Sequence, residues 1–241
     1  MPIFIKAKPG DIAENVVIGG DPERINALAR MLKGARLVSS NRGFIVYTGK
    51  FDGRRVTLAC HGIGQPSAAI AIEELIALGA RKIIRLGTCG ALEADIKIGD
   101  FVLAEGASYS HGGTITHYLD STLHGISLAQ TPDFELSRML VDALNEKKIK
   151  CKHTNVYSSD SFFSLSVKKA RELEKYGNGA IDMETATLFM LGKLKGIKTA
   201  ALLVVSDNVV KHTALMTHKD LEKKVSIAAK TALEALAKAV E

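Results

Sequence analysis

The fold is decided by the segment Val16-Val17-Ile18-Gly19-Gly20-Asp21-Pro22-Glu23-Arg24. Its β-branched apolar residues predict a buried strand, and its two glycines predict a sharp turn at the end of that strand. Asp-Pro then opens a predicted helix that carries Arg24 in its first turn. A helix start offers unpaired N–H groups and a guanidinium suits phosphate, so the segment predicts an anion site. The alternative interpretation is a plain strand-to-helix connection with a surface arginine.

Length and composition favour one domain over residues 1–241. The chain is 46% apolar and 24% charged, and no linker, repeat or low-complexity tract interrupts it. Its longest apolar run, 200–205, is too short to cross a membrane, and residues 1–10 show no signal-peptide pattern. The three cysteines form no C-x-x-C pair, which indicates a reducing compartment, so we expect a cytoplasmic protein.

The formal net charge of +6 invites a nucleic-acid hypothesis. Many lysines, however, lie in segments of mixed sign such as 168–175 and 219–224, and the chain has no Trp. A solvated surface explains this charge better than a nucleic-acid groove does. We therefore expect no nucleic-acid or membrane partner, whereas anionic small substrates are compatible with the charge.

Strand and helix patterns alternate along the chain, which predicts an α/β fold. Near-continuous apolar runs such as Ile83-Ile84 predict strands that are covered on both faces. We expect a three-layer sandwich with a central mixed, largely parallel β-sheet flanked by helices. Strands are expected at 16–18, 44–51, 56–60, 82–86, 101–105, 155–158, 180–181 and 199–205, with a hairpin turn at Asp52-Gly53, and helices after Asp21 and at 66–78, 133–148, 167–175, 183–194 and 219–240.

Ligands of such sheets bind beyond the carboxyl ends of the strands, and four predicted strand ends carry suitable groups. They are the segments 19–24, 61–67, 85–90 and 204–208. The second does not complete a G-x-G-x-x-G fingerprint, so it supports a dinucleotide site only weakly.

Arg85 stands inside an otherwise apolar strand, where burial is costly unless an anion pairs with the guanidinium. An ion pair with Glu73 or Glu74 and a role in ligand binding are equally compatible with the sequence. Thr88 follows as a hydroxyl donor between two glycines, a pattern typical of an anion cradle.

Three carboxylates also follow predicted strands. Asp207 can cap a helix, orient a loop, or act as a general acid if burial raises its pKa from about 4. Asp182 and Glu184 precede an apolar helix, so they can stabilise its start or accept hydrogen bonds from the hydroxyls of a ribose. Phosphate donors, diol acceptors and an acid at one edge of a sheet suggest phosphorolysis of a nucleoside.

His111, His117 and His124 lie in a Gly- and Thr-rich stretch that we expect to form a surface or pocket-rim loop. Their spacing fits no helical pair of metal ligands, and no cysteine is close to them in the sequence. We therefore expect no metal site there.

The ordered motifs of the chain resemble those of the nucleoside phosphorylase family of the small-subunit, hexameric type. The motifs are G-G-D-P-x-R, N-R-G at 41–43, H-G-I-G-x-P-S, I-I-R-x-G-T-C-G, S-S-D-S-F-F at 158–163, D-M-E-T-A and V-S-D-N. The resemblance runs from about Lys6 to the C-terminal helix. The family includes purine nucleoside and uridine phosphorylases, and the chain is most similar to archaeal-type purine nucleoside or 5′-methylthioadenosine phosphorylases.

The resemblance implies a pentosyltransferase of nucleoside catabolism and purine salvage. Inosine, adenosine and guanosine, with 5′-methylthioadenosine as a further candidate, would be converted to free base and ribose 1-phosphate. Inorganic phosphate would be the co-substrate, with no metal or organic cofactor, in a homohexamer (a trimer of dimers) that shares its sites across the dimer interface.

The family's roles carry over to matching positions of this chain. Phosphate would be bound by Gly20, Arg24, Arg85, Thr88 and a neighbour's Arg42, ribose by Ile63, Met183, Glu184 and a neighbour's Phe4, the base by Cys89, Gly90, Phe162, Asp182 and Ser206, and Asp207 would be the general acid at purine N7.

Three positions depart from the family's pattern. Asp182 stands where glutamate is usual and is one methylene shorter. Phe4 stands where purine enzymes often have a histidine that contacts the 5′-hydroxyl of a neighbour's substrate. No arginine in 217–221 matches the one that assists the acid in some purine enzymes, and Lys219 is the candidate substitute.

Other functions fit the residues less well. Uridine phosphorylase is the closest alternative, but the segment 164–178 has Arg171 without the glutamine that pyrimidine pockets typically need. A hydrolytic nucleosidase would have less use for Arg24, Arg42 and Arg85 together. A non-catalytic nucleoside-binding module would not need these arginines, and an NAD-dependent oxidoreductase would need a glycine fingerprint.

Overall fold

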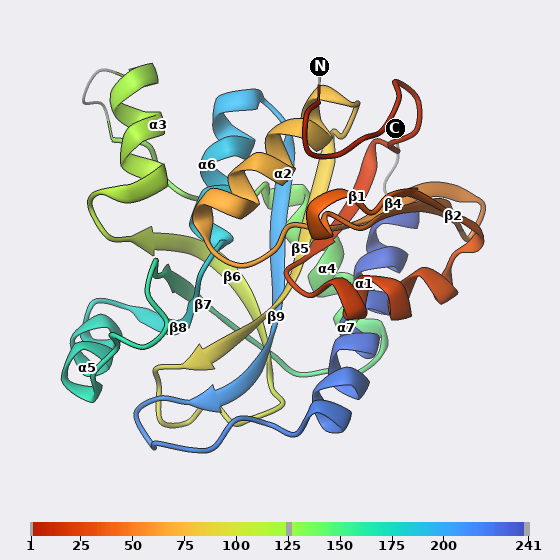
Figure 1. Ribbon diagram of the computed structural model, residues 1–241. Helices are drawn as coiled ribbons and strands as arrows, with labels where there is room; N and C mark the ends of the chain where they lie inside the picture. The colour runs from red at the N-terminus through yellow and green to blue at the C-terminus, as the bar shows by residue number, and fades with distance from the viewer. Residues whose placement is uncertain (1, 124–126, 239–241) are drawn as a thin grey trace.

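Strand β1 (Asn15–Gly19) runs through the apolar interior of the computed structural model, which describes residues 2–123 and 127–238 (Figure 1). Val16, Val17 and Ile18 are all fully buried. Because alternate side chains of a strand point to opposite faces, Val16 and Ile18 belong to one apolar cluster and Val17 to the other. The two clusters lie on the two faces of the sheet, so the predicted three-layer sandwich is confirmed.

The central sheet is mixed and largely parallel, as predicted. The other strands are β2 (Lys33–Ser39), β3 (Val46–Phe51), β4 (Arg54–Cys60), β5 (Lys82–Ala91), β6 (Phe101–Tyr109), β7 (Cys151–Ser158), β8 (Asn178–Asp182) and β9 (Lys198–Asn208). Within the described residues, the nine strands form one sheet in the order β2-β3-β4-β1-β5-β8-β7-β6-β9. Strand β9 also pairs with β5 in parallel, so β5, β8, β7, β6 and β9 close into a ring.

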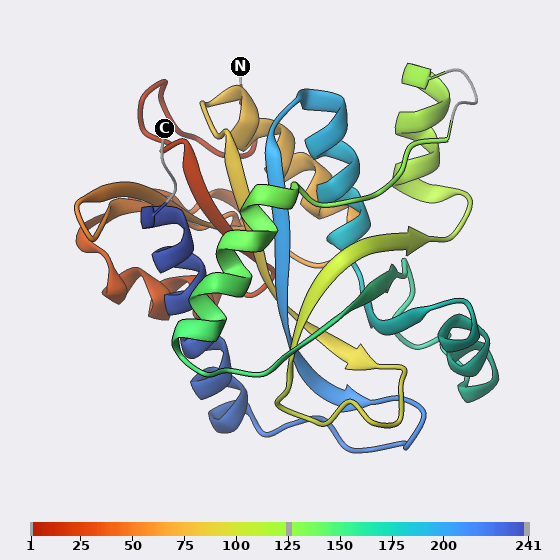
Figure 2. The same cartoon turned by 180° about the vertical axis from the view of Figure 1, so that it is seen from behind.

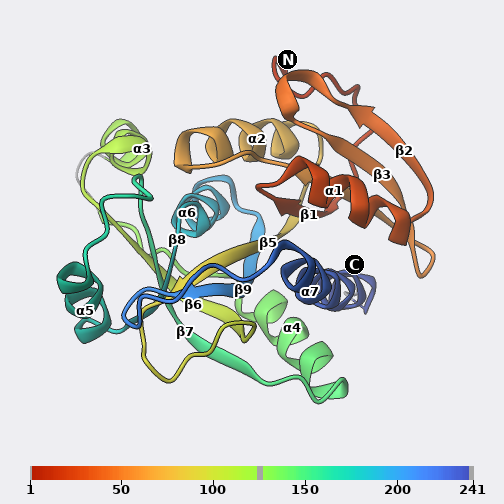
Figure 3. The same ribbon diagram turned by 60° about the horizontal axis from the view of Figure 1, so that its bottom comes forward.

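Helices cover both faces of the sheet (Figure 3). Their bounds are α1 (Pro22–Leu28), α2 (Gln65–Ala77), α3 (Gly113–Leu123), α4 (Phe134–Glu146), α5 (Val167–Lys175), α6 (Thr185–Lys195) and α7 (His218–Lys238). Helices α2, α3 and α6 contribute to one apolar cluster, and α1, α4 and α7 contribute to the other. Figure 2 shows α4 and α7 packed side by side on their face. In the described part of the chain, no helix is both long and apolar enough to cross a membrane.

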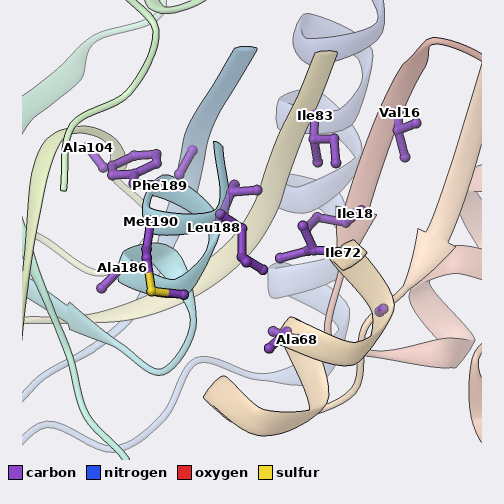
Figure 4. Packing of buried hydrophobic residues seen from close by; sticks show 14 of the residues in the cluster. Val16, Ile18, Ala68, Ile72, Ile83, Ala104, Ala186, Leu188, Phe189 and Met190 are labelled. Atoms are coloured by element: carbon purple, nitrogen blue, oxygen red, sulfur yellow. The ribbon is translucent and has the colours of Figure 1, made fainter. Parts of the chain in front are cut away.

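Helix α6 is buried on all sides from Thr185 to Gly192. Leu188, Phe189 and Met190 are fully buried and pack in the cluster that also holds Ile72 of α2 (Figure 4). A helix that is apolar all round is held inside a core. The residues that precede α6 are therefore carried into the interior on a rigid element.

Two elements depart from the sequence prediction. The strand β2 was not predicted, because it is an edge strand whose exposed, charged residues show no alternation. The prediction of a loop around His111 and His117 is wrong, because Gly113–Leu123 form the helix α3. Ile115 and Leu119, four residues apart, bury one face of that helix. His111 and His117 are exposed, and His124 lies outside the described residues.

Strands β5 and β9 extend beyond their predicted ends, and this changes the setting of the site. Strand β5 continues to Ala91 and β9 to Asn208. Thr88 and Asp207 therefore lie within strands and not in loops that follow them. The hairpin turn is confirmed: Asp52 and Gly53 have φ values of 47° and 80°, and positive φ at both central residues matches the twist of the flanking strands.

Candidate active site

A cavity of about 670 Å³ opens beside β5, β8 and β9 and the turns that follow β1 and β4. Its volume is in the usual range for small-molecule sites. Of the residues predicted for the site, those that line the cavity are Gly20, Arg24, Ile63, Arg85, Thr88, Cys89, Gly90, Phe162, Asp182, Met183, Glu184, Ser206 and Asp207. Arg42 and Phe4 are not part of the cavity wall. Among the described residues, no group of three His, Cys, Asp or Glu side chains could hold a metal ion.

A β-bulge brings consecutive residues of β9 into the cavity. Cys89 pairs with Val205 whereas Gly90 pairs with Asp207, so Ser206 is the extra residue. In a regular strand Ser206 and Asp207 would point to opposite faces, but here both line the same cavity. The Ser206 hydroxyl lies 2.8 Å from Asp207 Oδ1 and 3.2 Å from the Cys89 carbonyl, so it can donate to either.

Asp207 is half-buried at this bulge. Burial penalises the charged carboxylate and raises the pKa of Asp207, although the hydrogen bond from Ser206 opposes the shift. A carboxyl group that keeps its proton to higher pH is suited to general acid catalysis. The environment of Asp207 therefore supports the role predicted for it.

Arg85 on β5 is only 3% exposed and is surrounded by polar partners. Its Nε and Nη2 each lie 3.1 Å from Asp182 Oδ2, and Nη2 lies 2.6 Å from Glu184 Oε2. Its Nη1 lies 2.8 Å from His61 Nε2. Burial opposes the charge of the guanidinium, but the attraction of Glu184 and Asp182 prevails and raises the pKa of Arg85.

The partners of Arg85 differ from the ion pair that the sequence allowed. Glu74 accepts hydrogen bonds from the backbone N–H groups of Ile3, Phe4 and Ile5. Glu73 pairs with Lys195 at 3.0 Å. The interpretation of Arg85 as an ion-pair partner of Glu73 or Glu74 is therefore wrong, because both carboxylates bind other groups.

Asp182 has both carboxylate oxygens occupied by protein donors. Ser158 Oγ donates to Oδ1 at 2.6 Å, while Thr185 donates to Oδ2 through its backbone N–H at 3.0 Å and its hydroxyl at 2.5 Å. Asp182 thus stabilises the start of α6, which confirms one of the two interpretations of this carboxylate. It also neutralises Arg85, and its predicted contact with the base stays a prediction.

Glu184 connects the turn after β4 to Arg85 on β5. Its Oε1 accepts a hydrogen bond from the Gly64 N–H at 2.7 Å, and its Oε2 faces Arg85. Burial raises the pKa of Glu184, and the positive charge of Arg85 opposes that shift. A buried carboxylate beside a glycine-rich turn is suited to accept hydrogen bonds from a diol.

The turns after β1 and β4 approach each other closely. A Cβ added at Gly20 would lie 2.9 Å from the Gly62 carbonyl oxygen, which is too close for any side chain. Gly62 itself has a φ of +71° and Gly64 a φ of +86°, a backbone region that favours glycine. The glycines therefore allow two backbone segments to line one cavity.

The start of α1 is only partly as predicted. Asp21 accepts hydrogen bonds from the backbone N–H groups of Glu23 and Arg24, at 2.9 and 3.3 Å. The prediction of unpaired amides there is wrong for these two, because the helix is capped by its own aspartate. The Arg24 side chain still lines the cavity, and burial lowers its pKa despite the nearby Asp21.

Two large apolar side chains stand at the cavity in exposed positions. Phe162 is 62% and Ile63 is 75% exposed. The Phe162 ring makes an edge-to-face contact with Phe163, with centroids 5.1 Å apart. An exposed aromatic ring on a cavity wall is suited to stack on a flat ligand.

Arg42 and Phe4 lie together, away from the cavity of their own chain. The Arg42 guanidinium stands 5.6 Å from the centre of the Phe4 ring, and Phe4 contacts Phe44 edge-on at 6.1 Å. Arg42 adopts a left-handed backbone with φ of 54°. The prediction that both residues complete a neighbour's site stays a prediction.

Some contacts of the site were not foreseen from the sequence. His61 is fully buried at the end of β4, and its bond to Arg85 was not foreseen. His212 and Thr213 line the cavity beyond Asp207. The only sequence signal for His61 was its place beside the glycines of the second strand end.

Comparison with known proteins places the chain among phosphorylases. A family model described as "Phosphorylase superfamily" matches residues 14–241. A purine nucleoside phosphorylase DeoD-type of Xenorhabdus nematophila is 37% identical over 207 residues, which cover 85% of each chain. A guanosine phosphorylase of Halorubrum lacusprofundi is 35% identical over 201 residues, or 83% of this chain and 81% of that relative.

Solved structures show the same fold over almost the whole chain. A purine nucleoside phosphorylase from Toxoplasma gondii in complex with immucillin-H has a TM-score of 0.88 and 28% identity, covering 98% of this chain and 95% of that one. A uridine phosphorylase from Vibrio fischeri has a TM-score of 0.84 and 28% identity, covering 97% and 95%. The predicted fold class is confirmed by both.

Proposed function

Because the chain belongs to the phosphorylase superfamily, we propose that it cleaves purine nucleosides with phosphate to give the free base and ribose 1-phosphate. Family membership confirms the resemblance seen in the motifs. Relatives named purine nucleoside phosphorylase and guanosine phosphorylase support a purine substrate. Inosine, adenosine and guanosine are the first candidates.

The observation that carries this proposal is the convergence of three kinds of group in one cavity. Arg24, Arg85 and Thr88 supply donors for a phosphate. Glu184 is bonded to Arg85, so a ribose that it holds would lie next to that phosphate. Asp207 supplies a half-buried acid for the base.

The chemistry follows from these positions. A phosphate oxygen attacks C1′ of the ribose while the bond from C1′ to the base breaks, through a transition state in which the sugar is cationic. Phosphate and Glu184 stabilise that positive charge electrostatically. Asp207 donates its proton to N7 of the leaving purine, so the base departs neutral. This reaction uses inorganic phosphate as co-substrate and needs no metal or organic cofactor.

The choice between purine and pyrimidine rests on Asp207. A purine leaving group presents N7 as a proton acceptor, and a carboxyl with a raised pKa is suited to protonate it. The fold does not discriminate, since a purine nucleoside phosphorylase and a uridine phosphorylase are both similar to the chain. Uridine phosphorylase is therefore the second candidate.

A substrate panel tests the proposal. Base release is measured from inosine, adenosine, guanosine, uridine and 5′-methylthioadenosine, each with and without phosphate. We expect phosphate-dependent release from the purine nucleosides. Uridine as the best substrate would contradict the purine assignment, and release independent of phosphate would indicate a hydrolase.

The proposed assembly is a homohexamer, a trimer of dimers. It is supported by the position of Arg42 and Phe4 outside the cavity of their own chain, where a neighbour's cavity can receive them. A cytoplasmic location stays a prediction.

A further inference from the structure

We propose that His61 is a positioning residue for Arg85: its neutral imidazole accepts a hydrogen bond from the guanidinium and sets the direction in which Arg85 meets phosphate. The proposal rests on the proposed function, in which Arg85 binds phosphate. It gives a role to a buried polar side chain that the reaction itself does not use.

The hydrogen bond defines the protonation of the imidazole. His61 follows β4 and is fully buried, with Nε2 2.8 Å from Arg85 Nη1. A guanidinium has only donors, so Nε2 must be the acceptor and the ring proton must lie on Nδ1. A protonated imidazolium would place two donors against each other and break the contact.

The charges around the ring keep it neutral. Burial and the positive charge of Arg85 lower the pKa of His61 well below its usual value, and Arg24 of α1 adds to the effect. Asp182 and Glu184 face the guanidinium of Arg85 from the β8 side. His61 thus stays an acceptor through the neutral pH range.

The partners of Arg85 divide its donors between structure and ligand. Nε and Nη2 are directed at Asp182 and Glu184, which leaves Nη1 as the third nitrogen. His61 takes one of the two N–H groups of Nη1, since the two atoms are 2.8 Å apart. The planar guanidinium then has its last N–H in a fixed direction, and this N–H is the donor for phosphate.

Hydrogen bonds hold the backbone of His61 in place. Its backbone N–H donates to the Gly19 carbonyl at 2.9 Å, and the Ser67 hydroxyl donates to its backbone carbonyl at 2.7 Å. A Cβ added at Gly20 would come within 3.4 Å of His61 Cε1, so the ring also packs against the predicted phosphate glycine. His61 is therefore held between two parts of the phosphate site.

Packing in the core does not by itself explain why this buried ring is an imidazole. His61 Nδ1 is buried and has no hydrogen-bond partner among the described residues. A buried donor without a partner destabilises the fold, and an apolar ring of similar size would avoid that cost. What the imidazole adds over an apolar ring is the acceptor at Nε2.

Two substitutions at this position separate the acceptor from the shape. His61→Phe keeps a ring and removes the acceptor, so we expect the KM for phosphate to rise about tenfold to a hundredfold, as for loss of a hydrogen bond to a charged group. His61→Gln returns an acceptor oxygen near the place of Nε2, so it restores most of the wild-type KM. The KM for the nucleoside changes less in both. His153→Phe, on β7 and outside the cavity, is the matched control and keeps wild-type kinetics.

Wild-type protein labelled with ¹⁵N-histidine gives a test that needs no variant. We expect His61 to show the neutral Nδ1–H tautomer, unchanged from pH 6 to 8, with shifts when inorganic phosphate is added. An Nε2–H tautomer, or a ring that titrates in that range, would overturn the proposal even if His61→Phe does not fold.

Failure of this proposal differs from failure of the proposed function. A folded His61→Phe variant with an unchanged KM for phosphate, in an enzyme that performs phosphorolysis, overturns the role of His61 alone. A wild-type protein that neither binds inorganic phosphate in calorimetry nor cleaves any nucleoside with it overturns both.

Discussion

Oε2 of Glu184 lies 2.6 Å from Nη2 of Arg85, so the carboxylate proposed for ribose and the arginine proposed for phosphate are bonded to each other. Both side chains are almost fully buried. Two charges that leave water together need each other, and removal of one leaves the other unpaired in the interior. The two halves of the site are therefore coupled in stability as well as in binding.

Replacement of Arg85 tests this coupling. Arg85→Ala should severely weaken the use of phosphate, because a charged donor to a dianion is lost. It should also lower the free energy of unfolding by about 3–5 kcal/mol, because Asp182 and Glu184 remain buried without their cation. Steady-state kinetics and urea unfolding measure the two effects.

The matched control is Arg138→Ala. Arg138 pairs with Glu135 and Asp142 on the surface of α4, where solvent screens the charges and such pairs add little to stability. An unchanged KM for phosphate and unchanged turnover in Arg85→Ala would show that Arg85 has only a structural role.

Asp207→Asn tests the general acid. The variant should slow natural purine nucleosides by roughly a hundredfold to ten-thousandfold, the range typical of lost acid–base catalysis. A 7-methylated purine nucleoside, whose leaving group already carries the positive charge, should be spared. Equal losses on both substrates would show that Asp207 positions the base and does not protonate it.

The pH profile gives an independent check on the same residue. Because the pKa of Asp207 is raised by burial, the carboxyl stays protonated to higher pH than an exposed aspartate. Activity on natural nucleosides should fall as the pH rises through that pKa, and this fall should be absent in Asp207→Asn. A wild-type profile with no such limb would argue against proton donation by Asp207.

Mixed oligomers test the proposed sharing of sites. Arg42→Ala and Asp207→Ala should each be inactive, since each removes one residue of every site. Mixing them under exchange conditions should regenerate some activity, because hybrid sites combine an intact Arg42 with an intact Asp207. Activity assays measure the recovery, and light scattering measures the oligomeric state. A fully active monomer would contradict the sharing of sites between chains.

The 5′ side of the ribose is tested through Phe4. An aromatic edge offers no hydrogen bond to a 5′-hydroxyl but suits a methylthio group, whose burial contributes about 1 kcal/mol. We expect kcat/KM for 5′-methylthioadenosine to equal or exceed that for adenosine, and Phe4→His to shift the ratio by roughly an order of magnitude toward adenosine. An enzyme that cleaves adenosine well and 5′-methylthioadenosine not at all would refute this assignment.

Local patterns predicted much of the fold. The buried run of β1 and the Asp52-Gly53 turn were both visible in short stretches of sequence. The edge strand β2 and the helix α3 were missed, because an exposed edge shows no alternation and glycine and threonine obscure the short apolar stripe of α3.

The residues of the site were easier to predict than their partners. Local motifs and family resemblance identified Arg85 and Glu184, but the Arg85–Asp182 bond joins residues 97 positions apart. The bulge at Ser206 depends on the register between β5 and β9, which no local pattern reveals. His61 was missed as a functional residue for the same reason, since its importance comes from a contact made only in the folded chain.

The most direct test of the central claim is the stoichiometry of products from inosine and inorganic phosphate, followed by ³¹P NMR together with assay of the free base. The account predicts one ribose 1-phosphate for each hypoxanthine released, and no release when phosphate is omitted. Hypoxanthine released together with free ribose, at a rate independent of phosphate, would contradict it.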